Sequence, residues 1–263
     1  MNLIKPKKSL GQNFLIDKSV INLIIENGNI EKNDVVFEVG PGTGNLTEEI
    51  LSREPKKIFT VEKDKILANK LVEKFKDKIF MINKDILQIN EEKLSDQPMI
   101  VFGNLPYNIS TQILAKWIKI AHLNNTFKRL ILMFQKEVGE RIVADTNKKN
   151  YGRLSILTSW RMNVKKITDV SPKSFFPIPK VESTILLFEP KIKYYNLKNP
   201  KNLEYITNVF FNQRRKMIKK PINSLFKNPS ELSHKLNINL NDRPQNLTPT
   251  KYFEICKEYE KLF

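Results

Sequence analysis

Short apolar runs alternate with amphipathic segments along most of the chain. The runs are rich in β-branched and aromatic residues, which is typical of buried strands, and the segments between them have the apolar spacing of helices. Strands that alternate with helices in this way form parallel βαβ units, so the pattern predicts an α/β fold. The expected strands are 35–39, 58–61, 79–82, 99–102, 130–134, 164–170 and 181–188, of which the last two form a late hairpin.

The pattern changes near Pro190. Beyond this residue no β-branched run stands out, and the apolar residues of several segments have helical spacing. Residues 191–263 carry 15 Lys and Arg against 6 Asp and Glu, a net charge of +9. We therefore expect residues 1–190 to form the α/β domain, with a basic N-terminal arm, and residues 191–263 to form a small, basic, all-α C-terminal domain.

The net charge of the chain points to a polyanionic partner. The 45 Lys and Arg exceed the 28 Asp and Glu by 17. Neutralising a polyanion releases counterions, so nucleic acid is the leading partner and an anionic membrane surface the second. A lysine-rich proteome would also explain the excess.

No apolar run approaches the roughly 18–20 residues that span a bilayer, and the single cysteine, Cys256, leaves no metal-binding cluster. A cytoplasmic, metal-free protein without a membrane partner is expected.

The first predicted strand leads into a glycine-rich turn, Gly40–Gly44. Glycine lets the backbone approach a ligand closely, and the helix that follows offers free N–H groups. No Lys-Ser or Lys-Thr follows the turn, so it is not a phosphate-binding P-loop. Taken alone, the turn does not identify its ligand.

Three further polar groups follow the ends of successive predicted strands. Glu62 is suited to accept hydrogen bonds from both ribose hydroxyls of an adenosine-containing ligand. Asp85 could accept from an adenine amine while Ile86 packs on the ring, and Asn104 follows the fourth strand. Either carboxylate, taken singly, could be a helix cap or a solvated strand end. A dinucleotide enzyme would share the first two features only, so the series favours S-adenosylmethionine over NAD.

The turn Asn104-Leu105-Pro106-Tyr107 suits methyl transfer to the exocyclic amine of a planar base. Such an amine is a poor nucleophile because its lone pair is delocalised into the ring. An Asn oxygen and the next backbone carbonyl can accept its two N–H bonds and favour a pyramidal, reactive nitrogen. Pro106 holds the turn rigid, and Tyr107 offers a flat face on which the base can stack. By itself the tetrapeptide could also be an ordinary strand-ending turn.

Together these residues resemble the small-subunit ribosomal RNA adenine N6,N6-dimethyltransferase family. The resemblance runs nearly end to end, and its selective parts are the Gln12–Leu15 arm and the Phe-Phe-Pro-Ile-Pro-Lys-Val loop at 175–181. It implies a Rossmann-like, class I S-adenosylmethionine-dependent methyltransferase sheet of seven strands. The segments that carry it are Ser9–Leu15, the turn at Gly40, Glu62, Asp85, Asn104–Tyr107 and Phe175–Ser183.

The resemblance implies a role for each matching residue. Tyr107 and one Phe of the 175–176 pair would enclose a flipped adenine. Transfer from a sulfonium needs no covalent intermediate, which agrees with the lack of a plausible catalytic His or Cys.

The implied catalytic residues are Asn104, Leu105, Pro106 and Tyr107. The implied cofactor-binding residues are Asn13, Leu15, Gly40, Glu62, Asp85, Ile86 and Asn104. The implied substrate-binding residues are Tyr107, Phe175, Phe176, Arg214 and Arg215, although the two arginines could also belong to a solvated helix face.

The implied reaction is dimethylation of two adjacent adenines in the 3′-terminal stem-loop of small-subunit (16S) rRNA during ribosome biogenesis. The implied partner is an immature 30S-type subunit, and a monomer is expected.

Two alternatives stay open. A large-subunit rRNA adenine N6-methyltransferase of the macrolide-resistance type shares the fold, but Leu105, the 175–180 loop and the long basic tail lean against it. The protein could also act mainly as a ribosome-assembly binding factor, although its intact site favours an active enzyme.

Overall fold

The computed structural model describes residues 6–7, 10–120 and 122–262 of the 263-residue chain. The chain divides into two compact units. Met1–Gly139 and Val164–Pro190 form the first, which we call the sheet unit. Glu140–Asn163 and Lys191–Phe263 form the second, the helical unit. Lys5 and Lys8 of the basic arm lie outside the described residues.

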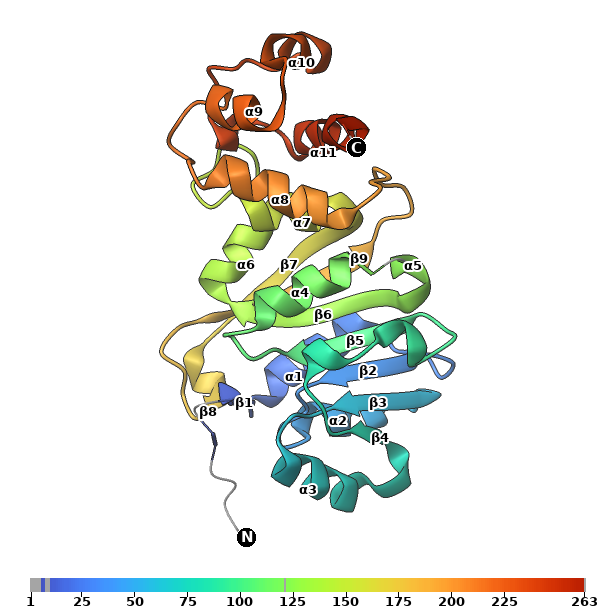
Figure 1. The fold of residues 1–263 in the computed structure, drawn as a ribbon. Helices are drawn as coiled ribbons and strands as arrows, with labels where there is room; N and C mark the ends of the chain where they lie inside the picture. Colours follow the sequence, from blue (N-terminus) through green and yellow to red (C-terminus); the bar gives the residue numbers. More distant parts are fainter. Residues whose placement is uncertain (1–5, 8–9, 121, 263) are drawn as a thin grey trace. The chain divides into compact units, whose positions relative to one another are not determined.

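The described part of the sheet unit contains a seven-stranded sheet in the order β4-β3-β2-β5-β6-β9-β7 (Figure 1). Strands β4, β3, β2, β5 and β6 are parallel, and β9 runs antiparallel to β6. This arrangement confirms the predicted α/β class, and β9 and β7, which correspond to the predicted late hairpin, are neighbours in the sheet. The strands are β2 (Val35–Val39), β3 (Lys57–Val61), β4 (Phe80–Ile82), β5 (Met99–Asn104), β6 (Phe127–Gln135), β7 (Met162–Val170) and β9 (Ser183–Pro190).

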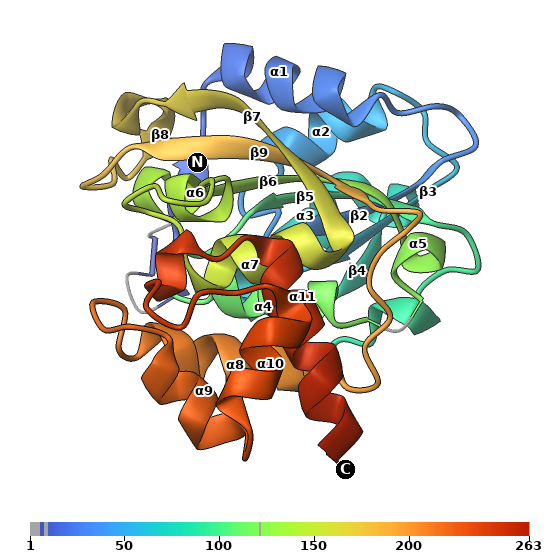
Figure 2. The ribbon, with the colours of Figure 1, turned by 90° about the horizontal axis from the view of Figure 1, so that it is seen from above.

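Helices cover both faces of this sheet, with α1 on one side and α4 on the other (Figures 1 and 2). Both faces of the central strands are therefore buried, which explains why every residue of β2 is buried and its sequence is continuously apolar apart from Glu38. The helices of the sheet unit are α1 (Lys18–Gly28), α2 (Asn45–Leu51), α3 (Lys65–Phe75), α4 (Ser110–Ile118) and α5 (Leu123–Thr126), and α6 (Lys136–Ile142) begins in it. Shorter 3-10 turns are Lys76–Lys78, Ile86–Gln88, Glu91–Lys93 and Pro172–Ser174.

Local sequence sets where α1 begins and how it packs. Asp17 caps the helix, since its Oδ1 accepts from the backbone N–H of Ser19 at 3.0 Å. The buried residues of the helix recur every three or four positions and form one face. They are Ile21, Ile24, Ile25 and Gly28.

Two segments far apart in the sequence form a second, two-stranded sheet. Strand β1 (Phe14–Leu15) runs antiparallel to β8 (Phe175–Phe176). The Ile16 N–H extends this pairing, donating to the Ser174 carbonyl at 2.9 Å. The arm and the proline-rich loop, which were singled out separately in the sequence, are therefore one local structure.

The described helical unit packs around aromatic residues. Tyr252 is fully buried, contacts Phe210 with ring centroids 5.3 Å apart, and donates to the Pro244 carbonyl at 2.7 Å. The Tyr151 hydroxyl donates to the Leu247 carbonyl at 2.9 Å. The helices are α7 (Arg153–Arg161), α8 (Pro200–Phe211), α9 (Lys219–Leu225), α10 (Pro229–Leu236) and α11 (Pro249–Tyr259), with 3-10 turns at Pro244–Asn246 and Glu260–Leu262.

The division between the units differs in one respect from the expected 1–190 and 191–263. It does fall after Pro190, but residues 140–163 belong to the helical unit. The reason is packing: α7 contacts α8 and α11, and the Tyr151 ring lies 6.3 Å from the Phe211 ring. The apolar spacing in this segment is typical of a helix, but it carries no information about which elements the helix packs against.

We expect Gly28→Ala to destabilise the sheet unit. A methyl at this position would lie 2.3 Å from Cζ of the fully buried Phe102, so the core would have to shift. Overpacking of this kind costs about 1–3 kcal/mol in the free energy of unfolding, which urea denaturation measures. The control is Asn22→Ala on the exposed side of α1, which we expect to be neutral. Equal stabilities for the two variants would contradict the close packing.

Candidate active site

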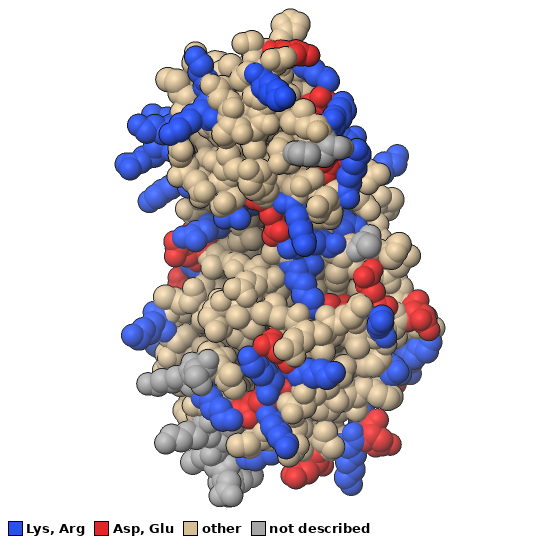
Figure 3. Space-filling view, viewed as in Figure 1, with Lys and Arg blue, Asp and Glu red and all other residues tan. Residues whose placement is uncertain are grey.

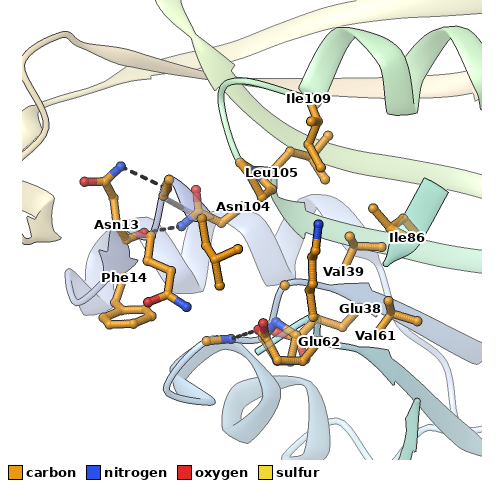
Figure 4. A pocket seen from close by; sticks show the side chains of 18 of the residues that line it. Asn13, Phe14, Glu38, Val39, Val61, Glu62, Ile86, Asn104, Leu105 and Ile109 are labelled. Carbon is orange, nitrogen blue, oxygen red and sulfur yellow. Dashed lines mark hydrogen bonds between the residues drawn. The ribbon is translucent and has the colours of Figure 1, made fainter. Parts of the chain in front are cut away.

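A pocket in the sheet unit lies at the carboxyl ends of β2, β3, β4 and β5 (Figure 4). Because these strands are parallel, the loops that follow them meet at one edge of the sheet. The arm at residues 10–15 forms a further wall. The pocket brings together all the predicted cofactor-binding and catalytic residues, namely Asn13, Leu15, Gly40, Glu62, Asp85, Ile86, Asn104, Leu105, Pro106 and Tyr107.

The glycine-rich turn needs glycine for two different reasons. Gly40 has φ +68°, and the nearest atom to an added Cβ would be the Asn104 carbonyl oxygen at 3.8 Å, so the turn leaves space beside that strand end. Gly42 has φ +58°, and its Cβ would lie 2.8 Å from the Phe14 ring. Left-handed backbone favours glycine at both positions, and the missing side chain at Gly42 also lets the arm pack on the turn.

Glu62 is nearly buried where β3 ends. Its Oε1 accepts from the Asp64 N–H at 2.8 Å and its Oε2 from the Gly42 N–H at 3.4 Å. Burial raises the pKa of this carboxyl. Each carboxylate oxygen can accept more than one hydrogen bond, so both can still receive a ligand hydroxyl.

Asp85 has a different charge environment. Its Oδ2 lies 2.8 Å from Lys63 Nζ, and its Oδ1 accepts from the Leu87 N–H at 3.0 Å. The hydrogen bond from Lys63 lowers the pKa of Asp85, which keeps it an ionised acceptor. Beside it, Ile86 is buried in the pocket wall, and Lys116 of α4 donates to the Ile86 carbonyl at 2.9 Å.

Glu38 belongs to the pocket, although we assigned it no role from the sequence. It lies on β2, only 1% exposed, and its Oε2 accepts from the Thr47 hydroxyl at 2.7 Å. Burial raises the pKa of Glu38 to about 8, and the negative charge of nearby Glu62 adds to the effect. A carboxyl inside an otherwise apolar strand was the signal that could have identified it.

The N-terminal arm is held against the pocket by polar contacts. Lys7 Nζ lies 2.9 Å from Asp64 Oδ2, and Gln12 Nε2 donates to the same oxygen at 3.1 Å. Burial alone would raise the pKa of Asp64, but the hydrogen bonds from Lys7 and Gln12 outweigh it and lower that pKa. Asn45 Nδ2 donates to the Leu15 carbonyl at 2.8 Å. These contacts place the arm over the glycine-rich turn.

The amide of Asn104 is oriented by the arm. Its Nδ2 donates to the backbone carbonyl of Asn13 at 2.8 Å (Figure 4). A carbonyl can only accept, so it must face the NH₂ group of Asn104. The side-chain oxygen of Asn104 is then the atom left to accept a hydrogen bond from a ligand.

The aromatic residues around the turn differ in exposure. Tyr107 is half-buried, its hydroxyl lies 2.6 Å from Ser183 Oγ, and burial raises its pKa, so the phenol stays neutral. Phe175 is 1% exposed and belongs to the hydrophobic core, whereas Phe176 is 50% exposed. Of the two predicted stacking residues, only Phe176 presents its ring to solvent. Leu105 is buried next to the turn.

The predicted RNA-contacting arginines lie in the helical unit and have different surroundings. Arg214 Nη2 donates to the carbonyls of Lys148 and Lys149, so it ties a loop to the unit. Arg215 is exposed and lines a surface hollow that includes Arg243, which the sequence analysis did not single out. Figure 3 shows basic side chains projecting from the surface around α9. The remaining residues of the hollow are Gln213, Lys216, Met217, Lys219, Lys220, Asn223 and Asn241.

The described residues lack two other kinds of feature. Nowhere in them do three or more His, Cys, Asp or Glu side chains come together in a group that could hold a metal ion. None of their helices is both long enough and apolar enough to cross a membrane.

The strand order, the glycine-rich turn after β2 and the carboxylate after β3 define a Rossmann-like class I methyltransferase. Within this class, the chain belongs to the ribosomal RNA adenine dimethylase family, whose model matches residues 4–261.

Two of the similar proteins span nearly the whole chain. A ribosomal RNA small subunit methyltransferase A from Pelagibacter ubique (strain HTCC1062) is 57% identical, with 98% of each chain covered. The protein of the same description from Wolbachia sp. subsp. Drosophila simulans (strain wRi) is 38% identical, covering 99% of this chain and 96% of its own.

Two solved structures have the same fold. A dimethyladenosine transferase from Plasmodium falciparum superposes with a TM-score of 0.77 at 25% identity, covering 94% of this chain and 98% of its own. The 23S rRNA methyltransferase ErmE has a TM-score of 0.69 at 22% identity, covering 93% of this chain and 100% of its own. The likeness to ErmE concerns the fold alone.

The buried Glu38 predicts a pH-dependent stability. A carboxyl with a folded-state pKa of about 8 and an unfolded value of 4.5 keeps its proton only in the folded state between these limits. The contribution of Glu38 to the free energy of unfolding is therefore fully present below pH 4.5 and is lost as the pH rises towards 8. The loss is at most about 1.4 kcal/mol per pH unit. Glu38→Gln preserves an acceptor for Thr47 and should flatten this fall in thermal melts. Parallel melting curves for the two proteins would contradict a protonated Glu38.

Proposed function

We propose that the protein is an S-adenosylmethionine-dependent rRNA (adenine-N6,N6)-dimethyltransferase that modifies two adjacent adenines in the 3′-terminal stem-loop of small-subunit rRNA. The observation that carries the proposal is the oriented amide of Asn104, whose Nδ2 is held by the Asn13 carbonyl and whose oxygen is left to accept a hydrogen bond. The family of the chain and the small-subunit substrate named for its 57% identical relative support the choice of base and RNA.

The pocket residues fit S-adenosylmethionine. Glu62 offers two buried oxygens to the ribose hydroxyls, and ionised Asp85 with apolar Ile86 suits the amine and the ring of adenine. Gly40 leaves room for the methionine part, and Asn13 and Leu15 close the pocket from the arm. When bound, this cofactor supplies an electrophilic methyl group on its sulfonium.

The Asn104 turn acts on the target amine. The Asn104 oxygen and the backbone carbonyl of Leu105 accept its two N–H bonds, which favours a pyramidal nitrogen with an available lone pair. Because the Asn13 carbonyl already holds the amide, little reorientation is needed when the amine arrives. The turn therefore contributes orientation and hydrogen bonding rather than a covalent intermediate.

The adenine must leave its stack to reach this turn. Tyr107 offers one aromatic face, and Phe176 is the second wall because Phe175 is buried in the core. The exposed cations around α9, Arg215 and Arg243 among them, contact RNA phosphates. The proposed partner is an immature small ribosomal subunit, which a monomer of this protein binds in the cytoplasm.

We expect the protein to methylate small subunits and not large ones. Primer extension on unmodified subunits, after incubation with the protein and S-adenosylmethionine, should stop at two adjacent adenines of the small-subunit RNA.

Asn104→Ala should still bind RNA but methylate about 10²–10³-fold more slowly, because the amine loses its oriented acceptor. Exposed Asn22→Ala is the control. Stops in large-subunit RNA would contradict the substrate, and a wild-type rate in Asn104→Ala would contradict the mechanism.

Arg215 should contribute to the salt dependence of RNA binding. Replacing it with Gln removes one exposed cation, so the slope of log K against log salt should become shallower by about 0.7–1. Charge reversal at Arg214 and Arg215 together should weaken binding further, although the Arg214 change also releases the Lys148–Lys149 loop. Arg53→Gln, an exposed arginine of the sheet unit, is the matched control. A slope that does not change in Arg215→Gln would exclude a phosphate contact.

A further inference from the structure

We propose that Ser183 is a positioning residue for the methyl-transfer reaction, acting through Tyr107. The inference rests on the proposed function, in which Tyr107 stacks on the target adenine. The observation is the hydrogen bond between the Tyr107 hydroxyl and Ser183 Oγ, 2.6 Å long. It joins the turn after β5 to the start of β9, two segments that the sequence does not place together.

Ser183 is itself held rigidly. It is fully buried, and it pairs with Gln135 in the antiparallel ladder between β9 and β6. Next to it, the Glu182 carbonyl accepts from the Lys136 N–H at 2.9 Å, and Lys136 Nζ lies 2.7 Å from Glu182 Oε2. The Ser183 hydroxyl is therefore a fixed point on the edge of the sheet unit where the proline-rich loop ends.

Anchoring the phenol fixes where the Tyr107 ring lies. The phenolic oxygen lies on the line that runs from Cβ through the ring, so holding this oxygen fixes the direction of the line and keeps the ring from swinging about the Cα–Cβ bond. Here the hydroxyl end is held, and Pro106 stiffens the attached end. The ring is then already placed where the adenine meets it, so stacking costs less conformational entropy.

The same hydrogen bond joins Tyr107, the first proposed wall of the base pocket, to the segment that carries Phe176, the second wall. Tyr107 belongs to the turn after β5, whereas Phe176 lies at the other end of the 176–183 segment that finishes at Ser183. Since the amine must be held in two successive orientations, first with no methyl and then with one, a mobile ring should impair the second transfer more than the first. The ratio of dimethylated to monomethylated adenine therefore reports the position of the ring.

A double-mutant cycle tests this role. The variants are Ser183→Ala, Tyr107→Phe and the double variant, with Ser52→Ala, an exposed serine after α2, as the matched control. Initial rates are measured with labelled S-adenosylmethionine on unmodified small subunits. Nucleoside chromatography, at equal total methylation, gives the share of N6-monomethyladenosine. Calorimetric titration with S-adenosylmethionine and thermal melts report cofactor binding and folding.

We expect each single variant to lower kcat roughly five- to tenfold, the range for loss of one hydrogen bond, with the KM for subunits nearly unchanged. The double variant should be no slower than the slower single variant, because all three lack the same bond. The monomethyl share should rise in each. A loss of folded protein alone would lower the rate but leave this share unchanged. Cofactor affinity and the control should match the wild type.

Three results would overturn the proposal. The first is a wild-type rate and product ratio in both single variants. The second is a multiplicative loss in the double variant, which would mean that the two hydroxyls act separately. The third is a rate loss fully explained by a lower melting temperature or weaker cofactor binding. Failure of the wild type to methylate small subunits would instead overturn the proposed function, and this inference with it.

Discussion

Parallel pairing of β4, β3, β2 and β5 is the constraint on which the site depends. It sends every strand in the same direction, so the residues that follow them meet at one edge although they are spread over some 70 positions of the chain. The backbone hydrogen bonds of the sheet fix the spacing between Glu62, Asp85 and Asn104 before any ligand arrives. Burial of both faces by helices keeps these strands apolar and leaves their ends as the place for polar chemistry.

Burial and neighbouring lysines shift the pKa of the acidic groups around the pocket in opposite directions. Glu38 and Glu62 lie inside the protein, and desolvation raises the pKa of both. Asp85 and Asp64 lie beside lysines, and the pKa of each is lowered. The pocket therefore combines carboxyls of raised pKa next to the sheet with carboxyls of lowered pKa at its rim.

The arm and the proline-rich loop complete the site from outside the main sheet. Asn13, next to the β1–β8 pairing, accepts a 2.8 Å hydrogen bond from Nδ2 of Asn104, which leaves the amide oxygen of Asn104 as the atom that can accept a further hydrogen bond. At the other end of the loop, Ser183 holds Tyr107. Groups on two separate segments thus hydrogen-bond to one four-residue turn.

The sequence by itself determined the α/β class, the change of composition after Pro190, and the residues at the strand ends of the pocket, because apolar periodicity and strand-end motifs are local features. It did not show that α7 packs in the helical unit, that Phe175 is buried while Phe176 is exposed, or that Arg214 ties down a loop while Arg215 stays exposed. Nor did it assign a role to Glu38 in the pocket. Only the tertiary structure decided these points, because burial and hydrogen-bond partners depend on residues far away in the chain, which local spacing does not encode.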